Sequence, residues 1–189
     1  MEPFALPHLE ARTATLEAFA DTIIPGEKRY PGDRAIAGVS EGGGAVTAGA
    51  LAVLEMPESG MAPSLDDLAS ALDVHAEEYR EEHDMGADDT APAFVTLPYE
   101  DRAALVLELT RPGHPEKVLW TGLALLCNMA FDTAAHLHTA EALADGHVGL
   151  TALGYRPPDE DGVWRFPGFS YRRRLAELHP DTIPSGSLA

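Results

Sequence analysis

The fold class of this chain is decided by the stretch Thr15-Leu16-Glu17-Ala18-Phe19-Ala20-Asp21-Thr22-Ile23-Ile24-Pro25-Gly26. Its apolar residues recur at helical spacing and share one face, namely Leu16, Phe19, Ala20, Ile23 and Ile24. Pro25-Gly26 ends the helix, because proline lacks the N–H group that a continuing helix needs. We therefore expect a helix from about Arg12 to Ile24 with one buried stripe.

The remaining sequence predicts further helices and no clear strand. The segment Arg34–Leu54 is rich in alanine, but Gly42-Gly43-Gly44 should divide it into two short helices. Ser64 is placed to cap a helix that buries Leu65, Leu68, Ala69, Leu72, Ala76 and Tyr79. Pro98 leads into a helix over Asp101–Thr110, and a long apolar helix over about Glu116–Leu143 should be central.

These segments predict an all-α fold, a compact bundle of about six helices in residues 1–154. After Gly154 the sequence becomes rich in Pro, Gly and aromatic residues, so residues 155–189 should form an irregular extension. We expect this extension to pack either on the bundle or on a partner.

The stretch from Thr15 continues into Pro31-Gly32-Asp33 and Ala37-Gly38-Val39, and this longer pattern resembles a known family. It is similar to subunit 3, the small subunit, of membrane-type gluconate 2-dehydrogenase. The resemblance covers Thr15–Val39 and extends to length and helical content. It implies a non-catalytic accessory subunit that stabilises or completes a glucose–methanol–choline-type flavoprotein oxidoreductase, with the flavin held by that partner.

Composition excludes several other classes of partner. The chain has 189 residues and a formal net charge of −18, so a phosphate backbone or an anionic membrane surface would repel it. The longest apolar passage, Val118–Ala130, is shorter than a bilayer requires. The single cysteine, Cys127, lies among apolar neighbours and predicts a buried thiol.

The N-terminus, Met1-Glu2-Pro3-Phe4-Ala5-Leu6-Pro7, has no basic segment followed by an apolar one. Relatives in the subunit 3 family often carry a twin-arginine export signal. The difference predicts a cytoplasmic protein.

A run of ten acidic residues with one base, Arg80, spans Asp66–Asp89. Such a run usually forms a solvated helix face, and a docking surface is the alternative. Asp66, Asp73, Glu77, Glu81 and Glu82 are expected to point away from the buried stripe of their helix.

Polar residues form a narrow stripe on the predicted central helix: Thr121, Asn128, Asp132 and Thr139, with His136 beside them. The stripe could face solvent, form a buried structural network, or line a pocket. In the last case Asp132 and His136, four residues apart, would act as an acid–base pair of a stand-alone enzyme on a small organic substrate. This enzyme is our alternative to the accessory subunit.

No cofactor or metal site is predicted. His75 and Glu78, and Asp132 and His136, have ligand spacing, but no paired Glu-x-x-His motif of a di-iron bundle occurs. The sequence also lacks a nucleophile elbow, a phosphate-binding loop and a dinucleotide fingerprint.

The C-terminal segment is the predicted partner-binding region. Five of the thirteen basic residues lie in Arg156–Arg174, interleaved with aromatic residues. Arginine and aromatic side chains dominate interface hot spots. The candidates are Trp164, Phe166, Phe169, Tyr171, Arg172, Arg173 and Arg174. Alternatively, Trp164 and Phe166 cap the chain's own bundle.

Overall fold

The structure is a computed structural model that describes residues 5–156 and Pro180, with side chains described from His8 onward. The chain divides into two units, Met1–Tyr155 and Arg156–Ala189. The following account concerns the first unit.

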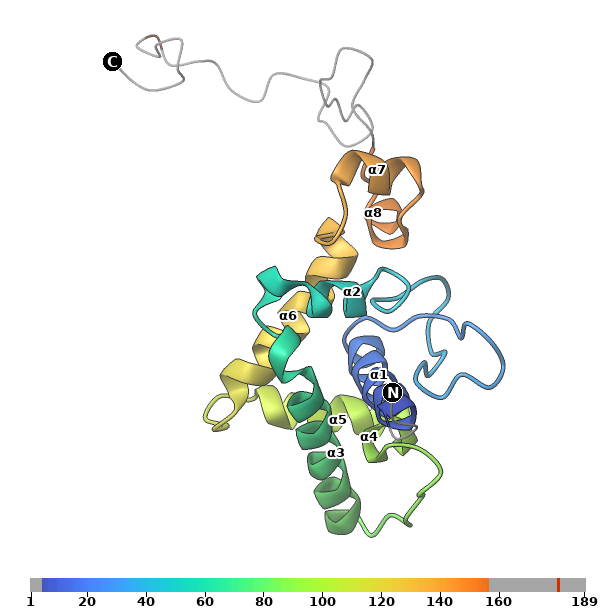
Figure 1. Ribbon diagram of the computed structural model, residues 1–189, viewed down its shortest axis with the longest axis vertical. Helices are drawn as coiled ribbons and strands as arrows, with labels where there is room; N and C mark the ends of the chain where they lie inside the picture. The colour runs from blue at the N-terminus through green and yellow to red at the C-terminus, as the bar shows by residue number, and fades with distance from the viewer. Residues whose placement is uncertain (1–4, 157–179, 181–189) are drawn as a thin grey trace. The chain divides into compact units, whose positions relative to one another are not determined.

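The described part of the first unit is all-α and contains no strand, which confirms the predicted fold class (Figure 1). Its helices are α1 (Ala5–Ile23), α2 (Ala50–Glu55), α3 (Leu65–Glu82), α4 (Ala93–Thr96), α5 (Tyr99–Thr110), α6 (Lys117–Thr133), α7 (Thr139–Ala144) and α8 (Val148–Ala152). Two single-turn 3-10 helices, Pro57–Ser59 and Ala62–Ser64, connect α2 to α3. Among these described helices, none is long and apolar enough to cross a membrane.

The core is centred on α1 and α6. Phe19 of α1 lies between Phe94 of α4 and Trp120 of α6, with ring centroids 6.5 and 6.2 Å apart. All three rings are fully buried. Truncating one such side chain to alanine costs about 3–5 kcal/mol, so this cluster is a main source of stability.

Helix α1 confirms the reading of the opening stretch. It ends at Ile23, before Pro25, and buries Leu16, Phe19 and Ala20. It begins at Ala5, earlier than the predicted start near Arg12. The guanidinium of Arg12 donates to Glu55 at 2.7 Å, which fastens this earlier part of α1 to the end of α2.

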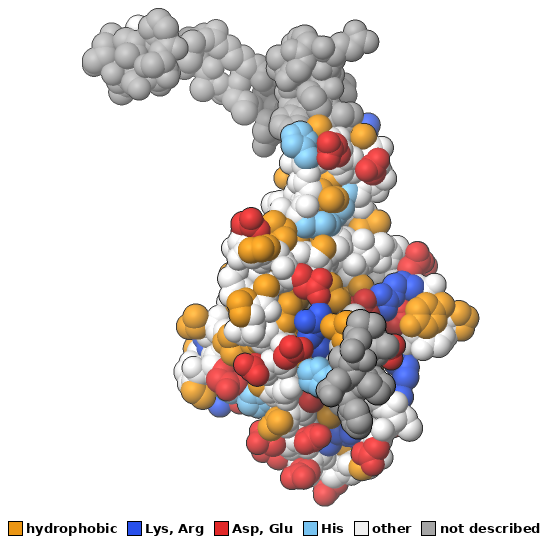
Figure 2. Space-filling model, viewed as in Figure 1, with side chains coloured by type: hydrophobic (Ala, Val, Ile, Leu, Met, Phe, Trp, Pro, Cys, Tyr) orange, Lys and Arg blue, Asp and Glu red, His pale blue; other side chains and the backbone are white. Residues whose placement is uncertain are grey.

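Helix α3 buries the predicted stripe, and its other side is mostly acidic. Figure 2 shows Asp and Glu side chains gathered over the end of the molecule where Figure 1 places the C-terminal half of α3. The prediction was wrong for Asp73, which is half-buried. Its carboxylate accepts hydrogen bonds from the Thr15 hydroxyl (3.1 Å) and the Phe94 N–H (3.0 Å), so it joins α1, α3 and α4.

The segment Arg34–Leu54 was predicted to form two helices, and only α2 forms. The backbone of Gly44 lies directly against the end of α1, since an added Cβ would overlap the Ile24 carbonyl oxygen. The Ala45 N–H donates to that carbonyl at 2.9 Å. The triglycine run thus permits a close backbone contact, and residues 24–49 form an irregular segment across the end of α1.

The predicted central helix over Glu116–Leu143 was too long, because α6 ends at Thr133. Ala134 adopts a left-handed conformation with φ of 50°, and α7 starts separately at Thr139. Ala134 is buried in a small cluster with Ala142 and Leu150. This packing offsets the cost of a left-handed alanine, about 1 kcal/mol.

Candidate functional site

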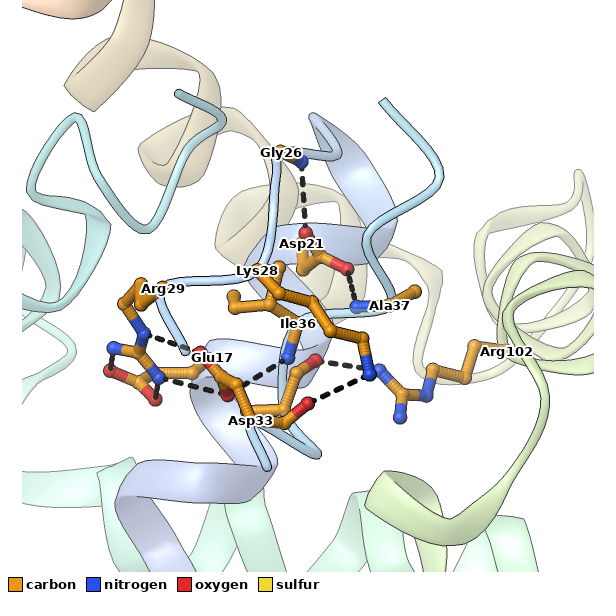
Figure 3. A network of polar contacts seen from close by, with 10 residues as sticks. Glu17, Asp21, Gly26, Lys28, Arg29, Asp33, Ile36, Ala37 and Arg102 are labelled. Atoms are coloured by element: carbon orange, nitrogen blue, oxygen red, sulfur yellow. Dashed lines mark hydrogen bonds and ion pairs between the residues drawn. The ribbon is translucent and has the colours of Figure 1, made fainter. Parts of the chain in front are cut away.

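The residues that carry the family resemblance form a polar network at the end of α1 (Figure 3). Asp21, in the last turns of α1, is buried, and its carboxylate accepts hydrogen bonds from the N–H groups of Gly26 (3.0 Å) and Ala37 (2.8 Å). Burial raises the pKa of Asp21, and the two N–H groups partly counter this. Asp21 therefore ties both ends of the segment 26–37 to α1.

A second buried carboxylate, Asp33, is held by Arg29. The Arg29 Nε donates to Asp33 at 2.7 Å, and the same guanidinium binds both carboxylate oxygens of Glu17 at 2.6 Å (Figure 3). Burial opposes ionisation of Asp33, but the hydrogen bonds from Arg29 and the Ile36 N–H outweigh it and hold its pKa below the ordinary value. The pattern Pro31-Gly32-Asp33 therefore fixes a turn.

Arg102 of α5 completes this network from inside the protein, and sequence analysis did not single it out. Its buried guanidinium donates to the carbonyl oxygens of Ala35 (2.7 Å), Arg34 (3.0 Å), Leu97 (3.0 Å) and Val95. One side chain thus joins the segment after Asp33 to the connection between α4 and α5. A lone arginine in an amphipathic helix carries no sequence signal for such a role, because its acceptors are backbone groups.

The polar groups of these residues form hydrogen bonds with other residues of the protein. The carboxylates of Asp21 and Asp33 and the guanidinium of Arg102 all have internal partners. Buried polar groups with complete partners stabilise a unique local fold. We conclude that this network holds the 24–49 segment in place. Glu17, Arg29 and Asp33 also line an open pocket of about 340 Å³, but their charged groups bind one another.

The predicted acid–base pair does not have the expected helical geometry. Asp132 is exposed in the last turn of α6, whereas His136 lies beyond the helix end at Thr133. Within the described part of the chain, no hydrogen bond or ion pair joins the two side chains. One helix does not run through both residues, so their i, i+4 spacing does not place them on one helix face, and a catalytic role of the two residues stays a prediction.

His136 instead lies near His147, with ring centroids 6.2 Å apart. Burial, and secondarily the neighbouring His147, lowers the pKa of His136, and its Nδ1 is buried without a hydrogen-bond partner. His147 Nε2 donates to the Ala48 carbonyl at 3.0 Å, and its Nδ1 accepts from the Leu150 N–H at 3.3 Å. These contacts fasten α8 to the start of α2.

The other residues of the predicted polar stripe lie on two elements. Thr121 and Asn128 are on α6, while Thr139 begins α7. The Asn128 side chain donates to the Ala124 carbonyl at 3.0 Å. Thr121 and Asn128 both line a groove, so part of the predicted polar stripe lies on a concave surface.

This groove, called here the α5–α6 groove, has a volume of about 570 Å³. The end of α1 contributes to its floor, and α5 and α6 form its walls. Most of its lining side chains are apolar or carry a single hydroxyl or amide: Thr22, Ile23, Ala103, Val106, Leu107, Thr110, Lys117, Thr121, Ala124 and Asn128. Leu107 is 71% exposed at its edge. An open apolar groove of this kind is suited to protein contact.

The predicted pair His75 and Glu78 lies in a cluster that spans α3 and α6. His75 Nε2 is 2.7 Å from a carboxylate oxygen of Glu116, and the Trp120 indole N–H donates to the same oxygen at 3.0 Å. Hydrogen bonds from Trp120 and His75 lower the pKa of Glu116. In the described residues, no three His, Cys, Asp or Glu side chains converge for metal binding.

Cys127 is fully buried, as predicted, and burial raises the pKa of its thiol to about 12. The predicted partner-binding residues Trp164, Phe166, Phe169, Tyr171, Arg172, Arg173 and Arg174 lie outside the described residues.

The fold and the site define an all-α protein with an internally satisfied polar network and an open apolar groove. The chain belongs to a family of unknown function, DUF5987, whose model matches residues 10–189. No curated protein and no solved structure matches it.

Proposed function

We propose that the protein is a non-catalytic accessory subunit that binds and stabilises a glucose–methanol–choline-type flavoprotein oxidoreductase. The class of partner comes from the resemblance of Thr15–Val39 to subunit 3 of gluconate 2-dehydrogenase. As part of the same proposal, the chain holds no flavin of its own and acts with its partner in the cytoplasm.

The observation that carries the proposal is the α5–α6 groove. Its edge presents Leu107 to solvent, and Lys117 is the one charged residue of its lining in a chain of net charge −18. The centres of protein interfaces are depleted of charge in this way. A partner helix that inserts apolar side chains between α5 and α6 would bury Leu107 and fill the groove.

The polar network supports a structural rather than a catalytic use of the matched motif. Asp21 and Asp33 are committed to backbone N–H groups and to Arg29. A catalytic acid needs a path to substrate, and both carboxylates are buried. The motif residues then serve to present a stable surface to the partner.

The test is co-expression with a flavoprotein of this class encoded beside the gene, followed by co-purification. Leu107→Glu places a charge in the groove and should abolish co-purification without lowering the melting temperature. The matched control is Val74→Glu on α3, since Val74 is 52% exposed and lies outside the groove. Equal co-purification of the two variants would contradict docking at the groove.

The same assay examines the C-terminal candidates. In a Trp164→Ala/Phe166→Ala variant, loss of co-purification with an unchanged melting temperature would support partner binding by this segment. A lowered melting temperature with retained binding would favour the alternative, in which both residues cap the bundle.

A further inference from the structure

A second exposed apolar surface lies on α6, beside the groove. Val118, Leu125 and Met129 are 86%, 58% and 43% exposed and recur at helical spacing, so they form one stripe along the helix. The stripe is turned by roughly 70° about the helix axis from the side that carries Thr121 and Asn128. We call these three residues the α6 stripe.

Helix α6 carries one opposite charge near each end. Lys117 lies in its first turn, after the acidic N-cap Glu116, and Asp132 lies in its last turn. Within the part of the chain that the structure describes, neither side chain forms an ion pair. Both charges are therefore available to a partner.

We propose that the α6 stripe binds the α6 stripe of a second copy of this chain, with the two helices antiparallel. A two-fold axis near Leu125 would then bring Lys117 of each copy to Asp132 of the other. By helical angle both residues lie on the groove side of the stripe, Asp132 about 40° and Lys117 about 100° from its centre, where Lys117 also lines the groove. Such an axis places like sides of the two copies together. One contact would thus bury the apolar residues and pair both charges.

Charge favours a second copy at this face. Helix α3 carries seven acidic residues within Leu65–Glu82, so two copies could not approach through it without strong repulsion. Helix α6 carries one acid and one base and is electrically neutral. In an antiparallel pair of α6 helices, the base of each copy therefore faces the acid of the other, although the whole chain has a net charge of −18.

The contact is small, because a 17-residue helix is only about 25 Å long. We expect a monomer–dimer equilibrium that depends on concentration. This inference goes beyond the accessory role, and its test uses the purified full chain alone, without a flavoprotein. Its failure would therefore leave the proposed function standing.

The experiment measures the dimer dissociation constant by sedimentation velocity from about 1 to about 100 μM. Lys117→Glu and Asp132→Lys should each weaken the dimer at least about tenfold, because each turns two attractive pairs into repulsive ones. The double variant should return to within about threefold of the wild type, because it restores both pairs with reversed sign. Leu125→Glu should abolish the dimer.

If only the total charge of each chain controlled dimerisation, the two single variants would differ in opposite directions from the wild type, so the experiment separates this explanation from the specific ion pairs. Lys117→Glu adds two negative charges and Asp132→Lys removes two, so general repulsion would make the second variant a tighter dimer. Both single substitutions suit the helix dipole, so neither should lower the melting temperature. A wild type that is monomeric throughout, or a double variant as weak as the single ones, would overturn the proposal.

Discussion

Replacing Arg102 by alanine should be among the most destabilising polar substitutions in this protein. The side chain is buried on α5 and donates to four backbone carbonyl groups, those of Arg34, Ala35, Val95 and Leu97. Alanine leaves these acceptors without a donor, in a region where few waters can replace it. The variant also removes a positive charge near the buried Asp21, whose pKa Arg102 helps to lower.

The magnitude follows from these contacts. A hydrogen bond from a charged donor contributes about 1.5–3 kcal/mol, but burying the guanidinium has its own cost, so the four bonds do not simply add. Removing one member of a buried charged network costs about 3–5 kcal/mol. In a domain of this size each kcal/mol lowers the melting temperature by about 2–4 °C, which gives a decrease of about 6–20 °C.

Thermal unfolding followed by circular dichroism measures this effect. The matched control is Arg111→Ala at the end of α5, which removes an exposed ion pair with Glu108 and should cost less than about 1 kcal/mol. Arg102→Lys should fall between the wild type and the alanine variant, since one ammonium group cannot reach four carbonyl groups. Melting temperatures of Arg102→Ala and Arg111→Ala within about 2 °C of each other would refute the role assigned to Arg102.

Three further predictions concern single groups. Asp33→Asn should lower the free energy of unfolding at pH 7 by about 2 kcal/mol. The pKa of Asp33 is lower in the folded state than its unfolded value of 3.8, so the difference between variant and wild type should shrink as the pH falls from 3.8 through the folded-state pKa. Urea unfolding at several pH values measures this difference. Cys127, with a pKa of about 12, should resist thiol reagents at pH 8 in the folded protein and react after denaturation; fast labelling of the native state would contradict its burial. Asp132→Asn should leave stability unchanged because the side chain is exposed, and a stable His136→Ala variant that loses a measurable turnover would favour the enzyme alternative.

Periodic apolar patterns predicted the helices whose ends carry ordinary stop signals. Pro25 follows α1, and Pro98 precedes α5. In these cases local sequence and tertiary packing agree, and the boundary can be read from the residues themselves. The buried stripe of α3 was also readable, because its apolar positions follow the helical period.

The end of α6 could not be read in this way. Ala134 is an ordinary helix former, yet it adopts a left-handed conformation because burial with Ala142 and Leu150 fixes the chain there. This constraint comes from residues that follow in the sequence and has no local signal. The helical geometry expected for Asp132 and His136 is absent for the same reason, because it assumed that the helix continues past Thr133.

The polar network at the end of α1 gives the sequence pattern of Thr15–Val39 a structural explanation, so the resemblance based on that pattern is weak evidence about function. In the segment Thr15–Val39, on which the resemblance is based, Asp21 and Asp33 hold a backbone turn in place. A chain can keep such a pattern because the fold needs it, whatever its partner or activity, since fold does not fix function. The proposed accessory role therefore depends on surfaces outside the motif, the α5–α6 groove above all. Substitutions at Leu107 test that role directly, whereas substitutions at Asp21 or Asp33 would test only the stability of the fold.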